Sequence, residues 1–539
     1  MIKSRLKPIL IAAAALCLTA PPSRLGAEDN LHRVWAVKDC AVVMPSGAPL
    51  AKANVVIRDG LVEAVGAGIA IPPDAEVIDG AKLTVYPGLI DAAGQSLIKF
   101  PEEKFDQAKY YSGEFNDKDR GISPEVRAYD LISLGKATLE KYHKLGILAA
   151  LALPDKGILT GQASFFVLSD PDKAKSLVLK DCALGVGLLA SSFPVYPSSL
   201  MGTVAFLRQE FSDIAYYGLQ SNRWRKEMKG NLRPAYSARF DIMGPFASGA
   251  KPVVFFCRNQ HDIRRGLDLA AELKLDFFIC DLGGEASEVI PELKQARARV
   301  LCTVAFKVPG TSLYAQRGKA EREKAEKEIY PRNPARLAEA GVPFAFSSFG
   351  TDDPKSFMEG VLKAVEAGLP KDKALAALTA TPAAFFGLEG ALGSVVPGKI
   401  ANLVLAEGDL LAKDAKVRMV FSDGTKVEFK EAKAEAGAKP TVNVSGKWDV
   451  TAEGAPTLSL ELTQEEGVVS GKLATPFGMF DFTGGTVSGN QFSCEISLSV
   501  GGQQIDLFIS GEVEGDAMRG TIVQGTSGSI EFSAKRIPA

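Results

Sequence analysis

The chain has 539 residues, of which 46% are apolar, 23% charged and 8% aromatic, and its formal net charge is −2. These values predict a globular protein with an ample core and exclude long disorder, a collagen and a disulfide-rich miniprotein. The near-neutral charge gives no reason to expect nucleic acid as a partner, because phosphate binding needs a basic face. With only His32, His143 and His261, the chain cannot build a binuclear metal site mainly from four imidazoles.

The first 27 residues have the pattern of an export signal. Lys3, Arg5 and Lys7 make a basic start, an apolar run follows over residues 9–18, and Ala27 offers a small residue for cleavage. We therefore predict that residues 1–27 are a signal peptide and that the mature chain is exported, to the periplasm or out of the cell. No later stretch reaches the length of a membrane helix, so no transmembrane segment is expected.

Export would place the remaining cysteines in an oxidising compartment, where disulfides can form. They are widely scattered, form no Cys-x-x-Cys pair and mostly sit in apolar, strand-like runs. This pattern favours buried free thiols over a disulfide framework. The six residues concerned are Cys40, Cys182, Cys257, Cys280, Cys302 and Cys494.

Residues 31–86 have a strand-and-turn pattern, with a hairpin expected around Asp59-Gly60. Over residues 87–389, short apolar runs alternate with helical stretches. Three of these runs end at or near Cys257, Cys280 and Cys302, which are 23 and 22 residues apart. That spacing suits successive strand–helix units of a parallel sheet, so we predict an α/β fold with a (β/α)₈ TIM-like barrel.

Strands return over residues 390–430, with a turn expected at Asp423-Gly424. Since the early strands alone are too few for a stable sheet, residues 31–86 and 390–430 are predicted to form one composite β-sandwich. Residues 430–445, rich in Ala, Lys and Glu, are expected to be a linker. Residues 446–539 contain about eight alternating strands with glycine turns, which predicts a separate all-β barrel or sandwich, lipocalin-like in pattern.

Four segments together resemble the amidohydrolase superfamily, and most closely its exported imidazolonepropionase-like members. They are NVVIRDGLVEAVG, AEVIDG, YPGLID and, far downstream, LTATPAAFFGLEGALGSVVPGKIANLVLAEGDLL. The resemblance covers roughly Leu31 to Phe429. It implies a distorted TIM barrel that carries a divalent metal, usually zinc, and hydrolyses non-peptide C–N bonds in small cyclic amides and related compounds. A small molecule is accordingly the expected substrate or ligand.

The resemblance also shows where this chain departs from the family. After PGLID the family carries His-x-His, whose imidazoles hold the more buried metal; the matching positions here are Ala93 and Gln95. Alanine cannot bind a metal, and a neutral amide oxygen is a poor zinc ligand. Two further family histidines fall near Cys257 and Cys280. The usual metal ligand set is therefore degenerate.

The family's last strand ends in a conserved aspartate that binds metal and serves as the base for the attacking water. The segment VPFAFSSFGTDD places Ser347, Ser348 or Phe349 there, with Asp352 and Asp353 slightly beyond. These two aspartates and His261, which opens a predicted helix, are the candidate catalytic residues. His261 can equally be a solvated loop residue beside that helix, and His143 is expected near the exposed end of another helix.

A rebuilt metal site is one reading of the cysteines. Thiolates are excellent zinc ligands and barrel-strand ends converge on one cavity, so Cys257, Cys280 and Asp91 are candidate ligands. In the alternative reading, cysteine only fills small apolar positions near the barrel mouth. The predicted cofactor is thus none, or one divalent metal, zinc if any. A one-residue shift of register would reverse the direction in which each cysteine points.

Candidate substrate-binding residues are Gln95 and Arg258 near the strand ends, and Tyr196 and Ser198 in the segment YPSSLMG. The hydroxyls of that segment either bind a ligand or cap the helix expected to begin near Thr203.

Two hypotheses follow for the whole chain. In one it is a hydrolase with a reduced or rebuilt metal site. In the other it is a pseudoenzyme that keeps the scaffold and serves as an envelope binding or scaffolding protein. An assembly of identical chains is compatible with both.

Overall fold

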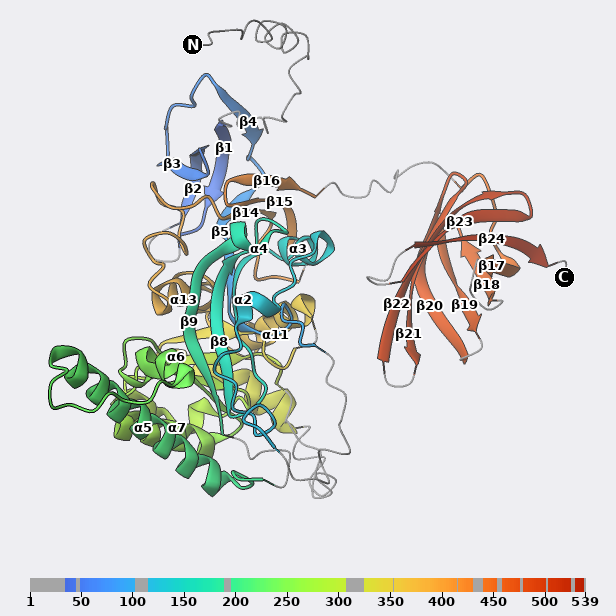
Figure 1. Cartoon of the computed structure of the whole chain (residues 1–539). Coiled ribbons are helices and arrows are strands. Elements are labelled where there is room, and N and C mark those ends of the chain that lie inside the picture. The colour runs from blue at the N-terminus through green and yellow to red at the C-terminus, as the bar shows by residue number, and fades with distance from the viewer. Residues whose placement is uncertain are drawn as a thin grey trace, which may run out of the picture. The chain divides into compact units, whose positions relative to one another are not determined.

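The structure is a computed structural model, and the chain forms two compact units, Met1–Glu428 and Phe429–Ala539 (Figure 1). The described residues are 34–44, 49–101, 115–188, 195–306, 324–351, 353–413, 415–429, 440–452, 458–475, 478–500, 503–524 and 529–537. The predicted signal peptide lies outside these residues and stays a prediction. Within the described part, no helix is long and apolar enough to cross a membrane.

A composite sheet unites the two flanks of the first unit. Its order is β16-β15-β14-β5-β1-β2-β3, with β4 paired to β1. The flanks join where β5 and β14 run antiparallel, with Leu403 opposite Pro87. The predicted union of the early and late strands is therefore confirmed as a single eight-stranded sheet. Its strands are β1 (Val34–Val42), β2 (Leu50–Arg58), β3 (Leu61–Gly66), β4 (Ala75–Asp79), β5 (Thr84–Pro87), β14 (Leu403–Glu407), β15 (Lys416–Ser422) and β16 (Thr425–Glu428).

Both predicted hairpin turns of this sheet are present. Asp59 and Gly60 link β2 to β3 with φ of 51° and 78°, and Asp423 and Gly424 link β15 to β16 with φ of 50° and 74°. Two successive residues with positive φ match the twist of antiparallel strands, and Asp-Gly adopts this conformation readily. One face of the sheet then buries a core that includes Trp35, whose ring meets Phe421 edge-on at 5.9 Å.

The second sheet of this unit is a nearly closed barrel. Its strands follow chain order from β6 to β13, and β13 returns to contact β6. The predicted barrel is confirmed. The strands are β6 (Leu89–Gly94), β7 (Ile147–Ala152), β8 (Leu159–Val167), β9 (Leu177–Gly187), β10 (Val253–Cys257), β11 (Phe277–Asp281), β12 (Arg299–Thr303) and β13 (Phe344–Ser347).

One strand differs from an all-parallel barrel: β8 runs antiparallel to both β7 and β9. Only residues 153–158 separate β7 from β8, and so short a connection allows a hairpin but no helical crossover. Five helices of the described residues precede β10. Three are short, α2 (Ala128–Leu131), α3 (Lys136–His143) and α4 (Lys173–Ser176), and two are longer, α5 (Leu200–Lys226) and α6 (Ala238–Ala247).

Regular strand–helix alternation holds from β10 onward. Helix α7 packs on β10 and β11: Gly266 faces Phe255 and Ile279, where an added Cβ would lie only 3.3–3.4 Å from their side chains. Inside the barrel, Phe278 of β11 packs against Phe385 and Phe386, at the end of α13. The remaining helices are α7 (Gln260–Leu273), η1 (Ala286–Val289), α8 (Ile290–Gln295), η3 (Ala325–Ile329), η4 (Tyr330–Arg332), α10 (Asn333–Ala340), α11 (Pro354–Glu366), α12 (Lys371–Leu378) and α13 (Ala380–Phe385).

The second unit is a closed antiparallel barrel in which each strand pairs with the next and β24 pairs with β17. The predicted separate all-β barrel is confirmed. Alternate side chains point inward and fill the interior with a core centred on Trp448, Phe492 and Ile509. The strands are β17 (Gly446–Ala452), β18 (Leu458–Glu465), β19 (Val468–Thr475), β20 (Gly478–Ser488), β21 (Gln491–Val500), β22 (Gln503–Glu514), β23 (Ala517–Gln524) and β24 (Ser529–Ile537).

Two local expectations can be compared with the structure. The cysteines predicted as free thiols are free, and all but Cys182 are buried. The expectation for His143 is wrong: it ends α3 but is buried, and its Nε2 lies 2.5 Å from the Leu168 carbonyl. Burial lowers the pKa of His143.

Candidate functional site

The carboxyl ends of the parallel barrel strands define a mouth, which is where side chains of TIM-like barrels converge. Register decides which cysteines reach it. Phe256 pairs with Cys280, and Cys257 pairs with Asp281. Phe256 and Cys280 belong to the barrel-interior core, whereas Phe255, on the same face as Cys257, packs against α7. Cys280 therefore points into the barrel and Cys257 points outward, so the two predicted metal ligands do not converge.

The outward face carries its own buried polar network. The Asp281 carboxylate accepts hydrogen bonds from the backbone N–H groups of Glu285 and Ala286 at 3.1 and 3.0 Å, and from Asn333 Nδ2 at 3.0 Å. The same Asn333 nitrogen lies 3.3 Å from Cys302 Sγ. Burial raises the pKa of Asp281 to about 6. These contacts order the turn into η1 and tie β11 and β12 to α10, which is a structural role.

Asp91 lies at the seam where β6 meets β13. Its carboxylate accepts hydrogen bonds from the Ser348 hydroxyl at 2.5 Å, from the Ser348 backbone N–H at 3.0 Å and from the Ala93 N–H at 3.3 Å. Ser347 Oγ adds a bond to the Ala93 carbonyl at 2.7 Å. A Cβ at Gly94 would lie 2.5 Å from Asp91 Oδ2, so only glycine leaves this space open. Both carboxylate oxygens are engaged within the protein, and Asp91 fastens the seam.

Asp155 is an acidic residue at the mouth that was not predicted from the sequence. Asp155, in the β7–β8 turn, is half-buried, and burial raises its pKa. Burial also raises the pKa of the Cys280 thiol well above its usual value, and the nearby carboxylates of Asp281, Asp155 and Asp91 raise it further. Asp155 comes soon after the buried strand β7, which ends at Ala152, and this position could have identified it as a residue of the mouth. It was missed because the short turn was not recognised as part of the mouth.

Tyr142 is a second group that the sequence did not single out. Its hydroxyl hydrogen-bonds with Ser96 Oγ just after β6. Burial, and then the charges of Asp91 and Asp353, raise the pKa of this phenol above its usual range, so the hydroxyl stays protonated. It is a neutral donor or acceptor at the same end of the barrel as Asp91.

Two aromatic side chains pack together at the carboxyl ends of barrel strands. The rings of Phe256, near the end of β10, and Phe349, just after β13, meet edge to face with centroids 5.2 Å apart. Both are buried and belong to the barrel-interior core together with Leu153 and Cys280. An added Cβ at Gly185 of β9 would lie 2.0 Å from Thr160 Oγ1 and 3.0 Å from the Phe256 ring, so this glycine leaves room for both side chains. We call Phe256 and Phe349 the aromatic plug.

The residues at the family's metal positions do not fit a metal ion. Ala93 is buried in the core, Gln95 is half-buried just beyond β6, and Ser347, Ser348 and Phe349, the candidates for the place of the family aspartate, carry no carboxylate. Cys280 points into the interior, whereas Cys257 and Cys302 are both paired with Asp281 and lie on the outward face. Throughout the described ranges, no three His, Cys, Asp or Glu side chains are placed so as to hold a metal.

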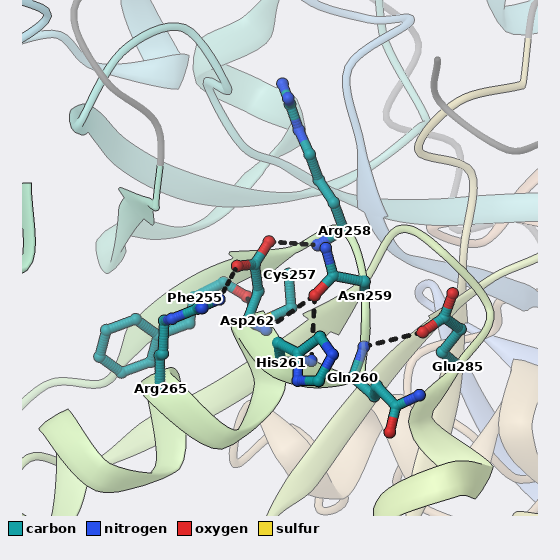
Figure 2. A network of polar contacts seen from close by, with 9 residues as sticks. All are labelled: Phe255, Cys257, Arg258, Asn259, Gln260, His261, Asp262, Arg265 and Glu285. Carbon is teal, nitrogen blue, oxygen red and sulfur yellow. Dashed lines mark hydrogen bonds and ion pairs between the residues drawn. The ribbon is translucent and has the colours of Figure 1, made fainter. Parts of the chain in front are cut away.

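The segment containing Arg258 and His261 forms the start of α7 (Figure 2). The Asn259 side chain accepts hydrogen bonds from the backbone N–H groups of His261 and Asp262, both at 3.0 Å. Asp262 in turn accepts from the Arg258 N–H and pairs with Arg265. The His261 ring is exposed, and Figure 2 shows the Arg258 side chain directed away from this network. Helix capping accounts for this motif.

The other predicted site residues are dispersed. Asp353 is exposed and caps α11, accepting a hydrogen bond from the Ser356 N–H at 2.7 Å, while Asp352 lies outside the described residues. Tyr196 and Ser198 are exposed before α5, where Ser199 provides the cap by accepting from Gly202 N–H. Catalytic or substrate-binding roles for these residues stay predictions.

Replacing Asp91 with asparagine is expected to change how the stability of the first unit depends on pH. Burial raises the pKa of Asp91 from 3.8 to about 6, against the opposing effect of its hydrogen bonds to Ser348 and Ala93. Between about pH 4 and 6 the folded chain keeps a proton that the unfolded chain has lost. The free energy of unfolding therefore falls as the pH rises, by about 3 kcal/mol for this one group.

Urea unfolding of the native chain and of Asp91→Asn at several pH values checks this prediction. Titrations common to both proteins, including that of His143, cancel in the difference between their free energies of unfolding. Relative to the variant, the native chain should be more stable at pH 4 than at pH 7. Asp268→Asn, at an exposed position of α7, is the matched control. A difference that stays constant from pH 4 to 7 contradicts the prediction.

Comparison with known proteins agrees with this fold. Residues 307–427 match the sequence profile described as "Amidohydrolase family". An amidohydrolase from Thermotoga maritima MSB8 is 23% identical, with a TM-score of 0.62 over 74% of this chain and 100% of that chain. A putative prolidase from Bifidobacterium longum is 17% identical, with a TM-score of 0.45 over 75% and 98%. A search among curated proteins finds no match. The resemblance to amidohydrolases expected from the sequence is confirmed.

Proposed function

We propose that this chain is a pseudoenzyme: a binding or scaffolding protein on an amidohydrolase barrel that no longer hydrolyses C–N bonds with a metal. The observation that carries the proposal is the content of the mouth. The aromatic plug of Phe256 and Phe349 is buried in the barrel-interior core, and Ala93, which the resemblance places at a metal-ligand position of the family, is part of the same core.

The buried carboxylate of Asp91 supports the same interpretation. It accepts three hydrogen bonds from Ser348 and Ala93, so most of its acceptor capacity already holds the seam between β6 and β13. Loss of those bonds would leave buried donors unsatisfied, at a cost of about 1–3 kcal/mol each. The side chains present therefore stabilise a closed mouth.

A hydrolase is the second candidate. The match to the amidohydrolase profile and the raised pKa of Asp91, about 6, favour it, because a carboxylate with that pKa is a suitable general base near neutral pH. Its substrate would be a small cyclic amide or related compound, as the family resemblance implies. This candidate requires the mouth to open, since Asp91 is fully buried.

Elemental analysis of the purified full chain, combined with hydrolysis assays, separates the two candidates. We expect well below one zinc, iron or manganese ion per chain, and no turnover of cyclic amides or dipeptides after incubation with each metal. Cys280→Ala and Cys257→Ala make a matched pair, because one thiol points into the barrel and the other points outward. Under the proposed function neither substitution changes metal content.

A stoichiometric metal that is lost in Cys280→Ala but kept in Cys257→Ala would refute the proposal and support a rebuilt metal site. Turnover that is abolished by Asp91→Asn, in a protein that still folds, would refute it in favour of the hydrolase. The envelope location rests on the predicted signal peptide, and cell fractionation of the full-length chain tests it separately.

A further inference from the structure

The connection between α5 and α6 exposes large apolar side chains. Along the last turns of α5 and the following loop, five of them are 61–94% exposed: Tyr216 61%, Leu219 70%, Met228 63%, Leu232 94% and Tyr236 77%. Single exposed apolar residues are common, but a cluster in one connection marks an interaction site. In Figure 1 this connection lies at the outer edge of the first unit, where α5 and α6 extend beyond the barrel.

Basic residues are interleaved with these apolar side chains. Residues 223–233 contain five cations and one acid, Glu227, for a net charge of +4, in a chain whose net charge is −2. Residues 195–306 are all described, and the structure records no ion pair for any of the five: Arg223, Arg225, Lys226, Lys229 and Arg233. We call residues 216–236 the basic tip.

Spacing places both kinds of side chain on one side of α5. Tyr216, Leu219, Arg223 and Lys226 are three or four residues apart, so they follow one another along a single helix face. Arg223, Arg225 and Lys226 also lie in the last turn of α5, where cations stabilise the helix end. That local effect does not account for Lys229 and Arg233 in the loop, nor for the exposed apolar residues.

The charge pattern decides between the partners that could cover this surface. A second copy of the chain, docked about a twofold axis, would bring two sets of like charges together. An acidic protein surface would satisfy the cations, but it would also have to present an apolar pocket that matches Leu232, which is 94% exposed. An anionic bilayer satisfies both, because phosphate headgroups meet the cations while short apolar side chains enter the acyl boundary.

We propose that the basic tip is a docking site for an anionic phospholipid surface. Lys226, Lys229 and Arg233 contact headgroup phosphates, and Met228 and Leu232 insert just below them. Peripheral binding of this kind needs no membrane-spanning helix. It is independent of what the barrel mouth does, so it stands whether the chain is a pseudoenzyme or a hydrolase.

Trp224 is an intrinsic fluorophore that can report binding of the basic tip to vesicles. Of the three tryptophans, Trp35 and Trp448 are buried in the two cores, and Trp224 lies half-buried within the basic tip. The full chain is mixed with vesicles of phosphatidylcholine containing about one third phosphatidylglycerol, and with vesicles of phosphatidylcholine alone. We expect co-sedimentation and a blue shift of Trp224 emission only with the anionic vesicles. Raising the salt from about 0.05 M to about 0.5 M should release the protein.

Two variants and a matched control complete the experiment. Neutralising three cations in Lys226→Gln/Lys229→Gln/Arg233→Gln should weaken vesicle partitioning on the order of 100-fold. Met228→Ser/Leu232→Ser should weaken it about tenfold or more while leaving the charges in place. The control, Lys82→Gln/Lys136→Gln/Lys294→Gln, removes three exposed cations elsewhere in the first unit and should bind as the native chain does. All these positions are exposed, and circular dichroism verifies that each variant folds.

Failure of the native chain to bind anionic vesicles would overturn the proposal. So would equal binding to phosphatidylcholine alone, or an equal loss in the control, which would indicate a nonspecific charge effect. Capture by polyaspartate with no binding to vesicles would instead assign the basic tip to an acidic protein and likewise overturn the lipid site.

Discussion

Replacing Phe256 with alanine is expected to lower the free energy of unfolding of the first unit by about 3–5 kcal/mol. The substitution removes half of the aromatic plug and leaves a cavity bordered by Phe349 and Gly185, which cannot collapse because the barrel strands around it are hydrogen-bonded in register. The edge-to-face contact, worth about 0.5–1.5 kcal/mol beyond burial, is lost as well. Chemical denaturation followed by circular dichroism measures the change.

Tyr236→Ala is the matched control for Phe256→Ala, because it also truncates an aromatic side chain of the first unit but one that is 77% exposed. Its free energy of unfolding should stay within about 0.5 kcal/mol of the native value. If Phe256→Ala cost less than about 1 kcal/mol, the mouth would not be tightly packed and an open, ligand-accessible barrel would have to be considered.

Truncating Trp448 to alanine is expected to destabilise the second unit by about 3–5 kcal/mol and to leave the first unit unchanged. The indole is fully buried at the centre of the antiparallel barrel, its Nε1 donates to the Val444 carbonyl at 2.8 Å, and the Arg536 guanidinium lies 4.7 Å from its ring centroid. Because the two compact units have separate cores, unfolding should show two transitions. In Trp448→Ala, only the transition of the second unit should shift to a lower temperature.

Phe508→Ala, at a position that is 49% exposed on the same barrel, is the control and should have a much smaller effect. Differential scanning calorimetry of the full chain resolves the transitions. Equal destabilisation of both units by Trp448→Ala would show that they unfold as one cooperative body, against the division seen in the structure.

Features that depend on a few neighbouring residues could be predicted from the sequence. The Asp59-Gly60 and Asp423-Gly424 hairpins depend on two adjacent residues that accept positive φ, and the glycine-separated strands of the second unit depend on simple alternation. The union of the two flanks was also predictable, because isolated strands need partners. The direction of β8 was not predicted, because it follows from the short connection to β7, residues 153–158, and not from the side chains of the strand itself.

The site was harder to predict because it depends on register across distant strands. If the register of β10 and β11 were shifted by one residue, Cys280 would point out of the barrel and Cys257 into it. Nothing in the apolar runs of the sequence determines this register. The Asn259-to-Asp262 segment looked like a candidate for chemistry because of His261, yet it caps α7. What the sequence did predict was the loss of imidazole at Ala93 and Gln95, because PGLID places those two positions by itself.

The seam fastened by Asp91 also bears on how the protein is made. Ser348 and Asp91 are 257 residues apart, and Tyr86 reaches the Gly408 carbonyl across 322 residues. The first unit therefore cannot close its barrel or its composite sheet until nearly all of its chain has left the ribosome. Contacts this distant form slowly, because a long loop must be ordered before they are made. A chain whose folding waits for its last strands stays unfolded while it is synthesised, which suits the export that residues 1–27 predict.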